Sequence, residues 1–339
     1  MDTAKLPPYI QALLNPEVFS HPAEDLKLVQ THISYVILAG DFVYKFKKEV
    51  DFGFLDFSTP AKRKKCCEQE LVLNRRLCPD IYLGLVTVYQ GDDGYSLSEP
   101  GQVVEHGIRM KRMPEERMMV NILKRGELER AHLDSIVDVL IPFYEQAEHN
   151  SEIDGFGTAQ AVGVNVLENF EQTKQFVGSE ALSRTQFEVI SGYASTFLQD
   201  TGKFTARIEA GRIRDCHGDL YSANICLDEQ VHIYDCIEFN RRFRYSDVAS
   251  DIAFLAMDLD FHRQNEAASY LVERFQADSG DTSLGEMLDF YKCYRAYVRG
   301  KIGLFTAGDP AVDAAVKKSS LAAAKQYFQL AWQYATANG

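Results

Sequence analysis

The chain has 339 residues, 46% of them hydrophobic, and a formal net charge of −13. This length predicts two lobes or domains, and because no apolar run approaches the roughly 20 residues of a transmembrane helix, we expect no membrane association. The negative charge disfavours a nucleic-acid-binding protein, which normally presents a basic face to the phosphates.

The first third of the chain is predicted to consist of β-strands around one helix. Residues 26–38 and 41–48 are rich in β-branched and aromatic side chains, and Gly40 between them signals a tight turn. A helix is predicted to begin at Ser58-Thr59-Pro60, where a capping residue precedes proline, and to end near Leu77. Two more strand-like runs follow the helix, at 81–90 and 103–113.

Beyond Pro114 the sequence changes to helical periodicity. The clearest helical runs lie at 131–149, 184–200, 289–305 and 319–335. A strand-loop-strand unit is predicted at 213–239, and the glycine-bearing stretch 151–165 is interpreted as an irregular loop. The prediction is an α+β protein with a β-rich lobe over 1–113 and a larger, mainly α-helical lobe over 114–339.

The stretch CHGDLYSAN at 216–224 carries a pattern that points to chemistry. Asp219 is followed after four residues by Asn224, and Asp235 ends the run VHIYD about a hairpin later. An amide oxygen and a carboxylate can provide two of the oxygen ligands that Mg²⁺ prefers, and a second carboxylate can accept the proton of an attacking hydroxyl. This order is that of the phosphoryl-transfer pattern H-R-D-x-x-x-x-N followed by an aspartate. Each residue alone is explained as a turn former, but the three together favour catalysis.

A phosphotransferase also needs a cation on the phosphates and a partner that holds it. Lys45 lies in the middle of its predicted strand, on the same face as an apolar residue that could cover an adenine. The expected partner is a helix glutamate: Glu68 and Glu70 both qualify, and Glu70 is favoured because leucines follow it at i+3 and i+7. The neighbouring Lys47 and Lys48 are interpreted as solvated strand lysines.

The segments HGDLYSAN, IYDCIEF and RYSDVASDIAFLA resemble the aminoglycoside phosphotransferase and choline-kinase group of the protein-kinase-like superfamily. The resemblance extends to VYKFKK and NRRL, and so covers about residues 26–260. It is nearest to an uncharacterised bacterial aminoglycoside phosphotransferase-like branch, whose longer members continue into a P-loop ATPase domain. No G-x-x-x-x-G-K-[ST] motif occurs in this chain. The resemblance implies a two-lobed kinase-like fold, in which a small antiparallel sheet with one main helix binds ATP and Mg²⁺.

Carried over position by position, the resemblance makes Asp219 the catalytic base and makes Asn224 and Asp235 the metal ligands. Lys45 becomes the contact to the α- and β-phosphates of ATP, and Glu70 becomes its ion-pair partner. One departure is the absence of a G-x-G-x-x-G loop before Lys45, so a tighter turn must cover the phosphates.

The resemblance also assigns several supporting positions. Ser34 falls where the family places its phosphate-covering loop, although an ordinary strand serine is an equally good interpretation. Met110 begins the link near which we expect the adenine. Asp251 is expected to tie the catalytic loop to the following helix, with Asp247 as a weaker competitor. Glu238 stands one place later than the glutamate of many relatives, so we expect it beside the metal ligands and not among them.

The sequence therefore predicts a small-molecule kinase: an ATP- and Mg²⁺-dependent phosphotransferase that moves the γ-phosphate to a hydroxyl group. Aminoglycosides, sugars, amino alcohols and nucleosides all remain open as acceptors. The alternative is a catalytically silent, kinase-like nucleotide-binding sensor or scaffold, against which the intact set of site residues argues. The seven cysteines contain no C-x-x-C pair and the N-terminus lacks signal-peptide features, so we expect a cytoplasmic protein. The sequence leaves the oligomeric state open.

Overall fold

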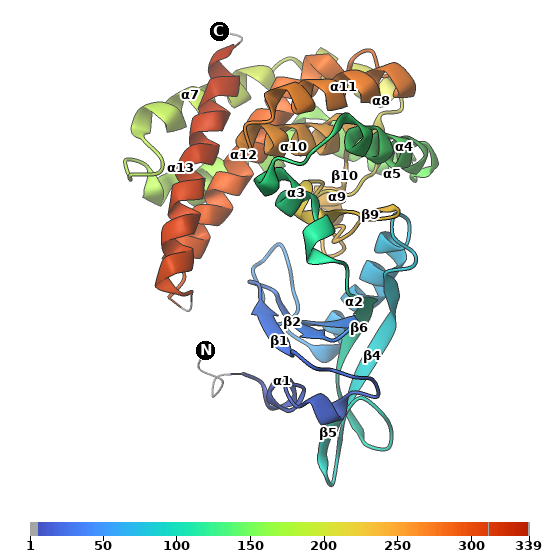
Figure 1. Cartoon of the computed structure of the whole chain (residues 1–339). Helices are drawn as coiled ribbons and strands as arrows, with labels where there is room; N and C mark the ends of the chain where they lie inside the picture. The colour runs from blue at the N-terminus through green and yellow to red at the C-terminus, as the bar shows by residue number, and fades with distance from the viewer. Residues whose placement is uncertain (1–5, 311, 338–339) are drawn as a thin grey trace. The chain divides into compact units, whose positions relative to one another are not determined.

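The computed structural model describes residues 6–310 and 312–337 (Figure 1). Its contacts divide the chain into two compact units. Met1–Met118 together with Cys226–Arg241 form the strand unit, and Met119–Ile225 together with Arg242–Gly339 form the helical unit. Within the described ranges, no helix combines the length and the hydrophobicity needed to cross a membrane.

The strand unit is built on one antiparallel sheet of six strands in the order β1-β2-β3-β6-β4-β5. The strands are β1 (Lys27–Gln30), β2 (Ser34–Ala39), β3 (Phe42–Lys47), β4 (Tyr82–Gly91), β5 (Gly94–Ser96) and β6 (Gln102–Lys111). The sheet with its single long helix in one unit, and a mainly helical second unit, confirm the predicted α+β class.

The strand-like run 26–38 forms two strands and not one, because the chain turns between β1 and β2. The N–H of Thr31 donates to the carbonyl oxygen of Ser34 at 3.0 Å, and the N–H of Ser34 donates to Thr31 Oγ1 at 2.9 Å. The hydrogen bond that the Thr31 hydroxyl oxygen accepts stabilises a turn inside a run of residues that otherwise favour strands.

The long helix of the strand unit, α2 (Pro60–Asn74), begins where its capping residues predicted. Thr59 Oγ1 accepts the N–H of Lys62 at 3.3 Å, and proline occupies the first turn. The helix ends at Asn74, three residues before the predicted end. It packs against β6 and β4, and Met110 of β6 lies in the apolar core beneath it. A short helix, α1 (Pro8–Ala12), precedes the sheet.

The helical unit contains most of the remaining helices. They are α3 (Met119–Arg125), α4 (Arg130–Gln146), α5 (Ser151–Asp154), α6 (Ala159–Thr173), α7 (Arg184–Phe197), α8 (Thr201–Glu209), α10 (Val248–Phe261), α11 (Asn265–Ser279), α12 (Leu284–Gly308) and α13 (Ala314–Ala337). Its core is formed by α10, α12 and α13, which pack on one another (Figure 1). The first twelve residues of α10 are all buried, which explains its almost uniformly apolar sequence.

The prediction of an irregular loop over 151–165 was wrong, because the segment is helical. It contains α5, a 3-10 turn at Gly155–Gly157 and the first half of α6. Two capping side chains start these helices: Asn150 accepts the N–H of Ile153, and Thr158 accepts the N–H of Ala161. The caps outweigh the unfavourable helix propensity of the glycines.

Two short strand pairs flank the motif CHGDLYSAN. β7 (Ile213–Asp215) pairs with β10 (Tyr245–Asp247), and β8 (Ile225–Leu227) pairs with β9 (Val231–Ile233). A four-residue helix, α9 (Arg241–Arg244), precedes β10. The motif therefore lies on a loop between two strands, as its sequence predicts.

The turn between β2 and β3 requires glycine. Gly40 has a φ of +56°, and a Cβ atom there would collide with the carbonyl oxygen of Pro22. Gly53 has a φ of +79° but has no atom within 4 Å of such a Cβ. Gly53→Ala should therefore cost only the left-handed strain of about 1–2 kcal/mol, whereas Gly40→Ala should cost about 1–3 kcal/mol more. The free energies of unfolding of the two variants test this, and equal losses would contradict it.

Candidate functional site

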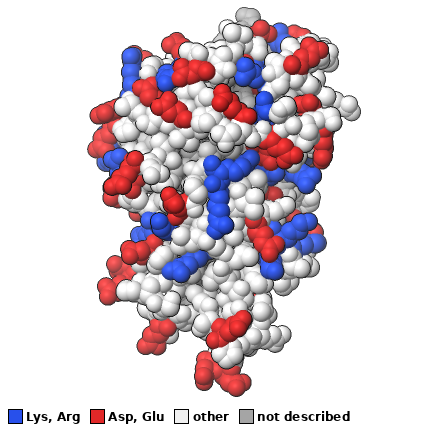
Figure 2. Space-filling view, turned by 90° about the vertical axis from the view of Figure 1, so that its right-hand side faces the viewer, with Lys and Arg blue, Asp and Glu red and all other residues white. Residues whose placement is uncertain are grey.

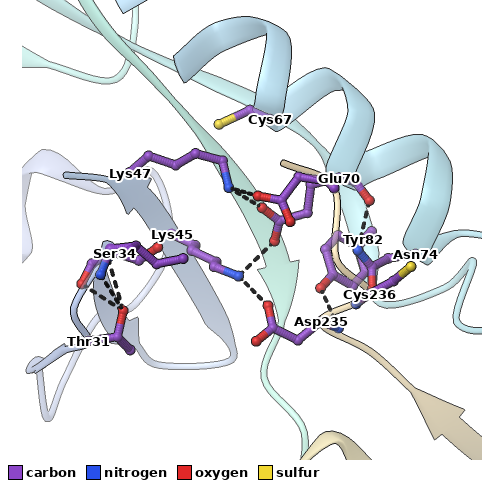
Figure 3. Close-up of polar contacts among 12 residues, drawn as sticks. Thr31, Ser34, Lys45, Lys47, Cys67, Glu70, Asn74, Tyr82, Asp235 and Cys236 are labelled. Carbon is purple, nitrogen blue, oxygen red and sulfur yellow. Dashed lines mark hydrogen bonds and ion pairs between the residues drawn. The ribbon is translucent and has the colours of Figure 1, made fainter. Parts of the chain in front are cut away.

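Lys45, Glu70 and Asp235 meet within the strand unit (Figure 3). Lys45 Nζ lies 2.8 Å from Glu70 Oε1 and 2.5 Å from Asp235 Oδ1. The Glu70 side chain is completely buried, whereas that of Asp235 is 43% exposed. Glu68, the other glutamate that qualified from the sequence, forms an exposed ion pair with Lys64 at 3.4 Å. Lys45 thus pairs with Glu70, the glutamate that the leucines at i+3 and i+7 favoured in the sequence.

Lys47 is the clearest disagreement with the sequence analysis. It was interpreted as solvated, but its side chain is 1% exposed. Its Nζ lies 2.7 Å from Glu70 Oε2 and also donates to Glu238 Oε1. Because side chains alternate along a strand, Lys45 and Lys47 leave β3 on the same face, and Figure 3 shows both directed toward Glu70. Each oxygen of the Glu70 carboxylate therefore has a lysine of its own.

The charges of this cluster stabilise one another. Burial disfavours the charged form of Lys45, but Asp235 and Glu70 outweigh it and raise its pKa well above the ordinary value. Burial likewise acts to raise the pKa of Glu70, but Lys45 and Lys47 hold it below the ordinary value. Burial raises the pKa of Glu238, and Lys47 opposes that rise. The Lys45–Glu70 pair is therefore ionised at neutral pH.

Asp235 is positioned by its backbone as well as by Lys45. It follows β9 and has a φ of +64°. Its N–H donates to the hydroxyl of Tyr82 at 3.3 Å, and the next N–H, that of Cys236, donates to Asn74 Oδ1 at 2.9 Å. Asn74 Nδ2 in turn donates to the carbonyl oxygen of Glu70 at 2.9 Å, which fixes the orientation of its amide. The last turn of α2 therefore anchors the backbone at Asp235.

Asp219 and Asn224 meet on the loop between β7 and β8 in the helical unit. Asn224 Nδ2 donates to the carbonyl oxygen of Asp219 and to its Oδ2, both at 3.0 Å. The amide Oδ1 is consequently the atom left to act as a metal ligand. The N–H of Asp219 donates to Nδ1 of the buried His217 at 3.2 Å, so the histidine holds the loop.

The backbone of the loop at residues 216–224 is held by Asp251, which lies in the first turn of α10. Its Oδ2 accepts the N–H of His217 at 2.8 Å, and its Oδ1 accepts that of Gly218 at 3.0 Å. Tyr144 donates its hydroxyl to the same carboxylate at 3.1 Å. Asp251 thus ties the loop to the following helix as expected. Asp247, the competitor, instead pairs with Arg207 at 2.7 Å.

Two loop contacts were not predicted from the sequence. Arg295 of α12 donates through Nη1 to the carbonyl oxygen of Gly218 at 3.0 Å. Asp258 of α10 accepts the N–H of Ser222 through Oδ2 at 2.9 Å. Asp258 lies seven residues, or two helical turns, after Asp251, so the two carboxylates lie on the same face of α10. This spacing is the sequence signal from which the contact of Asp258 with the loop could have been predicted.

Ser34 and Met110, both expected near the nucleotide, are buried. Within the described part of the chain, Ser34 Oγ has no hydrogen-bond partner, and Ser34 pairs in register with Lys47 across β2 and β3. Met110 packs in the core with Val43 and Tyr82. Their roles toward a nucleotide remain predictions.

The chemistry of the proposed metal ligands fits Mg²⁺. Magnesium in nucleotide sites usually takes only one or two protein oxygens and completes its shell with phosphates and water. Among the residues that the structure describes, no three His, Cys, Asp or Glu side chains form a group that could hold a metal by themselves. The amide oxygen of Asn224 and the partly exposed carboxylate of Asp235 are hard donors of the kind that such a site needs.

The surface carries charges of both signs. On the face drawn in Figure 2, acidic side chains are spread widely, with basic side chains interspersed among them. On this face the acidic side chains are therefore not confined to one cluster.

Comparison with known sequences gives relatives without a described activity. No protein-family model matches the chain. Uncharacterized proteins of Mycobacterium bovis and Mycobacterium tuberculosis are 33% identical to it over 305 residues. The match covers 86% of this chain and 58% of each relative, so the chain spans less than two thirds of their length.

Comparison with solved structures finds small-molecule kinases. A choline/ethanolamine kinase family protein from Mesorhizobium loti aligns with a TM-score of 0.49 and 12% identity, covering 93% of this chain and 94% of that chain. The ADP-bound aminoglycoside phosphotransferase APH(2'')-Ib gives 0.48 and 14%, with 97% and 99% covered. The choline kinase LicA from Streptococcus pneumoniae gives 0.48 and 13%, with 94% and 99% covered. Their names are those of the group that the sequence motifs resemble.

Glu70 should matter to stability as well as to the site. Glu70→Gln removes the one charge that the buried Lys47 and the 15% exposed Lys45 share, and breaking a buried pair in this way costs about 3–5 kcal/mol. Glu68→Gln on the same helix removes only an exposed pair and should change the free energy of unfolding by less than about 0.5 kcal/mol. Denaturant titrations of both variants measure the difference, and similar values for the two would contradict the buried network.

Proposed function

We propose that this protein is an ATP- and Mg²⁺-dependent phosphotransferase that moves the γ-phosphate of ATP to a hydroxyl group of a small molecule. The observation that carries the proposal is the ion-pair network of Lys45 with Glu70 and Asp235. It combines a fixed cation, its buried counter-charge and a partly exposed carboxylate within one unit. The hydrogen-bonded pair of Asp219 and Asn224, at the spacing of a phosphoryl-transfer loop, supports it.

Each side chain has a distinct task in the proposed reaction. Lys45 binds the α- and β-phosphates, and Glu70 holds its ammonium group in place. Asn224 and Asp235 hold the metal ion, which neutralises charge on the phosphates when bound. Asp219 orients the acceptor hydroxyl and takes its proton as the new P–O bond forms and the bond to the β-phosphate oxygen breaks. ADP and a phosphomonoester are the products.

The contacts of the catalytic loop suit Asp219 for this task. Its carboxylate receives a hydrogen bond from the Asn224 amide, which stabilises the ionised form that a base requires. Its backbone is fixed through His217 and Gly218, both of which donate to the buried Asp251. A base held by backbone contacts loses little entropy when the hydroxyl arrives. We propose that the acceptor binds in the lobe that carries this loop, residues 114–339. We propose that residues 1–113 form the nucleotide-binding lobe.

The most direct test is a metabolite-library screen for ATP-dependent phosphorylation, with ADP formation as the readout. Asp219→Asn should lower the rate with any acceptor found, by about 10²–10⁴-fold, because the general base is lost. The variant should still bind ATP, since the proposal assigns the nucleotide to Lys45 and the metal ligands and assigns Asp219 to the acceptor hydroxyl. Asp228→Asn, an exposed substitution in the β8–β9 turn, is the matched control and should retain the wild-type rate.

Two results would contradict the proposal. One is an acceptor that wild type and Asp219→Asn phosphorylate at equal rates. The other is stabilisation of both proteins by ATP with negligible turnover in either, across the library and in the slow hydrolysis of ATP by water. The second result would identify a catalytically silent nucleotide sensor or scaffold.

A further inference from the structure

The proposed function leaves a second buried ion pair unexplained. Lys47 and Glu238 are both almost completely buried, and Lys47 Nζ donates to Glu238 Oε1 as well as to Glu70 Oε2. Lys47 also lies 4.9 Å above the centroid of the Phe57 ring. A phosphate-binding lysine and its glutamate need neither Lys47 nor Glu238. Burying the extra pair costs desolvation energy for both charges, so their role calls for an explanation.

The position of Glu238 in the chain suggests that role. Residues 234–239, here called the Asp235 segment, contain the proposed metal ligand and end next to Glu238. At one end, the backbone is held by Tyr82 and Asn74. At the other end, the side-chain contact to Lys47 holds Glu238. Lys47 therefore connects the Asp235 segment to β3 and, through Glu70, to α2.

The charges of the cluster explain why the Lys47–Glu238 contact is needed in addition to the Lys45–Asp235 contact. Two lysines face three carboxylates in this cluster, which leaves one negative charge in excess when all five are ionised. Lys45 contacts both Glu70 and Asp235. If Lys45 binds phosphates while Asp235 serves as a metal ligand, the Lys45–Asp235 contact must weaken. The Lys47–Glu238 contact involves neither of these groups and is unaffected by that exchange.

We propose that Lys47 is a positioning residue, which holds the Asp235 segment through Glu238 so that Asp235 keeps the place of a metal ligand when Lys45 turns to the phosphates. The inference rests on the proposed function, because it takes Asp235 as a ligand of the nucleotide-bound metal. Its consequence is specific: Lys47 acts on the metal-dependent part of nucleotide binding and not on nucleotide binding as such.

A role in stability alone is the competing explanation, and a double variant separates the two. Replacing a buried ion pair by apolar residues of similar size is often neutral or stabilising, whereas removing one partner is destabilising. Lys47→Met together with Glu238→Met should therefore fold, since Glu70 loses its contact with Lys47 but keeps Lys45 as its counter-charge, and it removes the charge contact that holds the segment. Lys64→Gln, which removes an exposed pair on α2, is the matched control.

The experiment measures ADP affinity by calorimetry with Mg²⁺ and with EDTA, for wild type, the double variant, Glu238→Gln and the control. The factor by which Mg²⁺ improves ADP affinity should fall about 10–100-fold in the double variant, which is the loss typical of groups that support metal ligands. ADP affinity in EDTA should change less than about twofold, because Lys45 keeps its ion pair with Glu70. Glu238→Gln should shift the Mg²⁺ factor in the same direction, and Lys64→Gln should leave it unchanged.

The outcomes distinguish this inference from the proposed function. If wild type gains no ADP affinity from Mg²⁺, the proposed function fails and the inference fails with it. If wild type gains affinity and the folded double variant gains as much, Lys47 is not a positioning residue and the proposed function stands. If the double variant does not fold, the pair is structural and the inference is also overturned.

Discussion

A completely buried carboxylate with a lysine on each of its oxygens is the interaction on which the candidate site depends. An unpaired carboxylate at Glu70 would lose several kcal/mol of hydration free energy, so the fold that buries it must supply cations. β3 supplies both, because Lys45 and Lys47 are two residues apart and leave the strand on one face. Two rigid elements, a strand inside the sheet and a capped helix, therefore set the position of the cation. The positions of the two lysines are therefore fixed by the regular alternation of side chains along β3 and not by a loop.

The loop at residues 216–224 has the opposite arrangement, in which a buried carboxylate accepts hydrogen bonds from backbone N–H groups. Asp251 accepts two consecutive N–H groups, those of His217 and Gly218, from the first turn of a helix that is almost wholly buried. Gly218 has a φ of +85°, a conformation that other residues adopt only with strain, and its carbonyl oxygen is bound by Arg295. The N–H and C=O groups around Gly218 are thus both paired, so a loop without regular secondary structure has few alternative conformations.

The sequence predicted the features that rest on local chemistry. The cap at Thr59, the turn at Gly40 and the choice of Glu70 over Glu68 follow from spacing along the chain, whereas the pairing of Lys45 with a helix glutamate was expected from the phosphotransferase pattern. Lys47 was misjudged although strand alternation placed it beside Lys45, because a buried lysine is reasonable only when its counter-charge is known, and Glu238 lies 191 residues away. The turn at residues 31–33 was missed for a related reason. It depends on a hydrogen bond to the Thr31 hydroxyl, and β-branched composition alone predicts a strand there.

The backbone at Asp235 has an unusual conformation that is fixed by hydrogen bonds, with a φ of +64°. A positive φ is uncommon for a residue other than glycine, and aspartate accepts it at a cost of about 1 kcal/mol or more. Such a conformation persists only where neighbouring contacts determine it, and here Tyr82 and Asn74 bind the two successive N–H groups. Both contacts are to the backbone, so under the proposed function the carboxylate exchanges its lysine partner for a metal ion while the chain stays in place. If Lys47 is the positioning residue that we propose, the strained backbone and the buried Lys47–Glu238 pair serve one purpose: they keep the Asp235 side chain in one direction whether it faces a lysine or a metal ion.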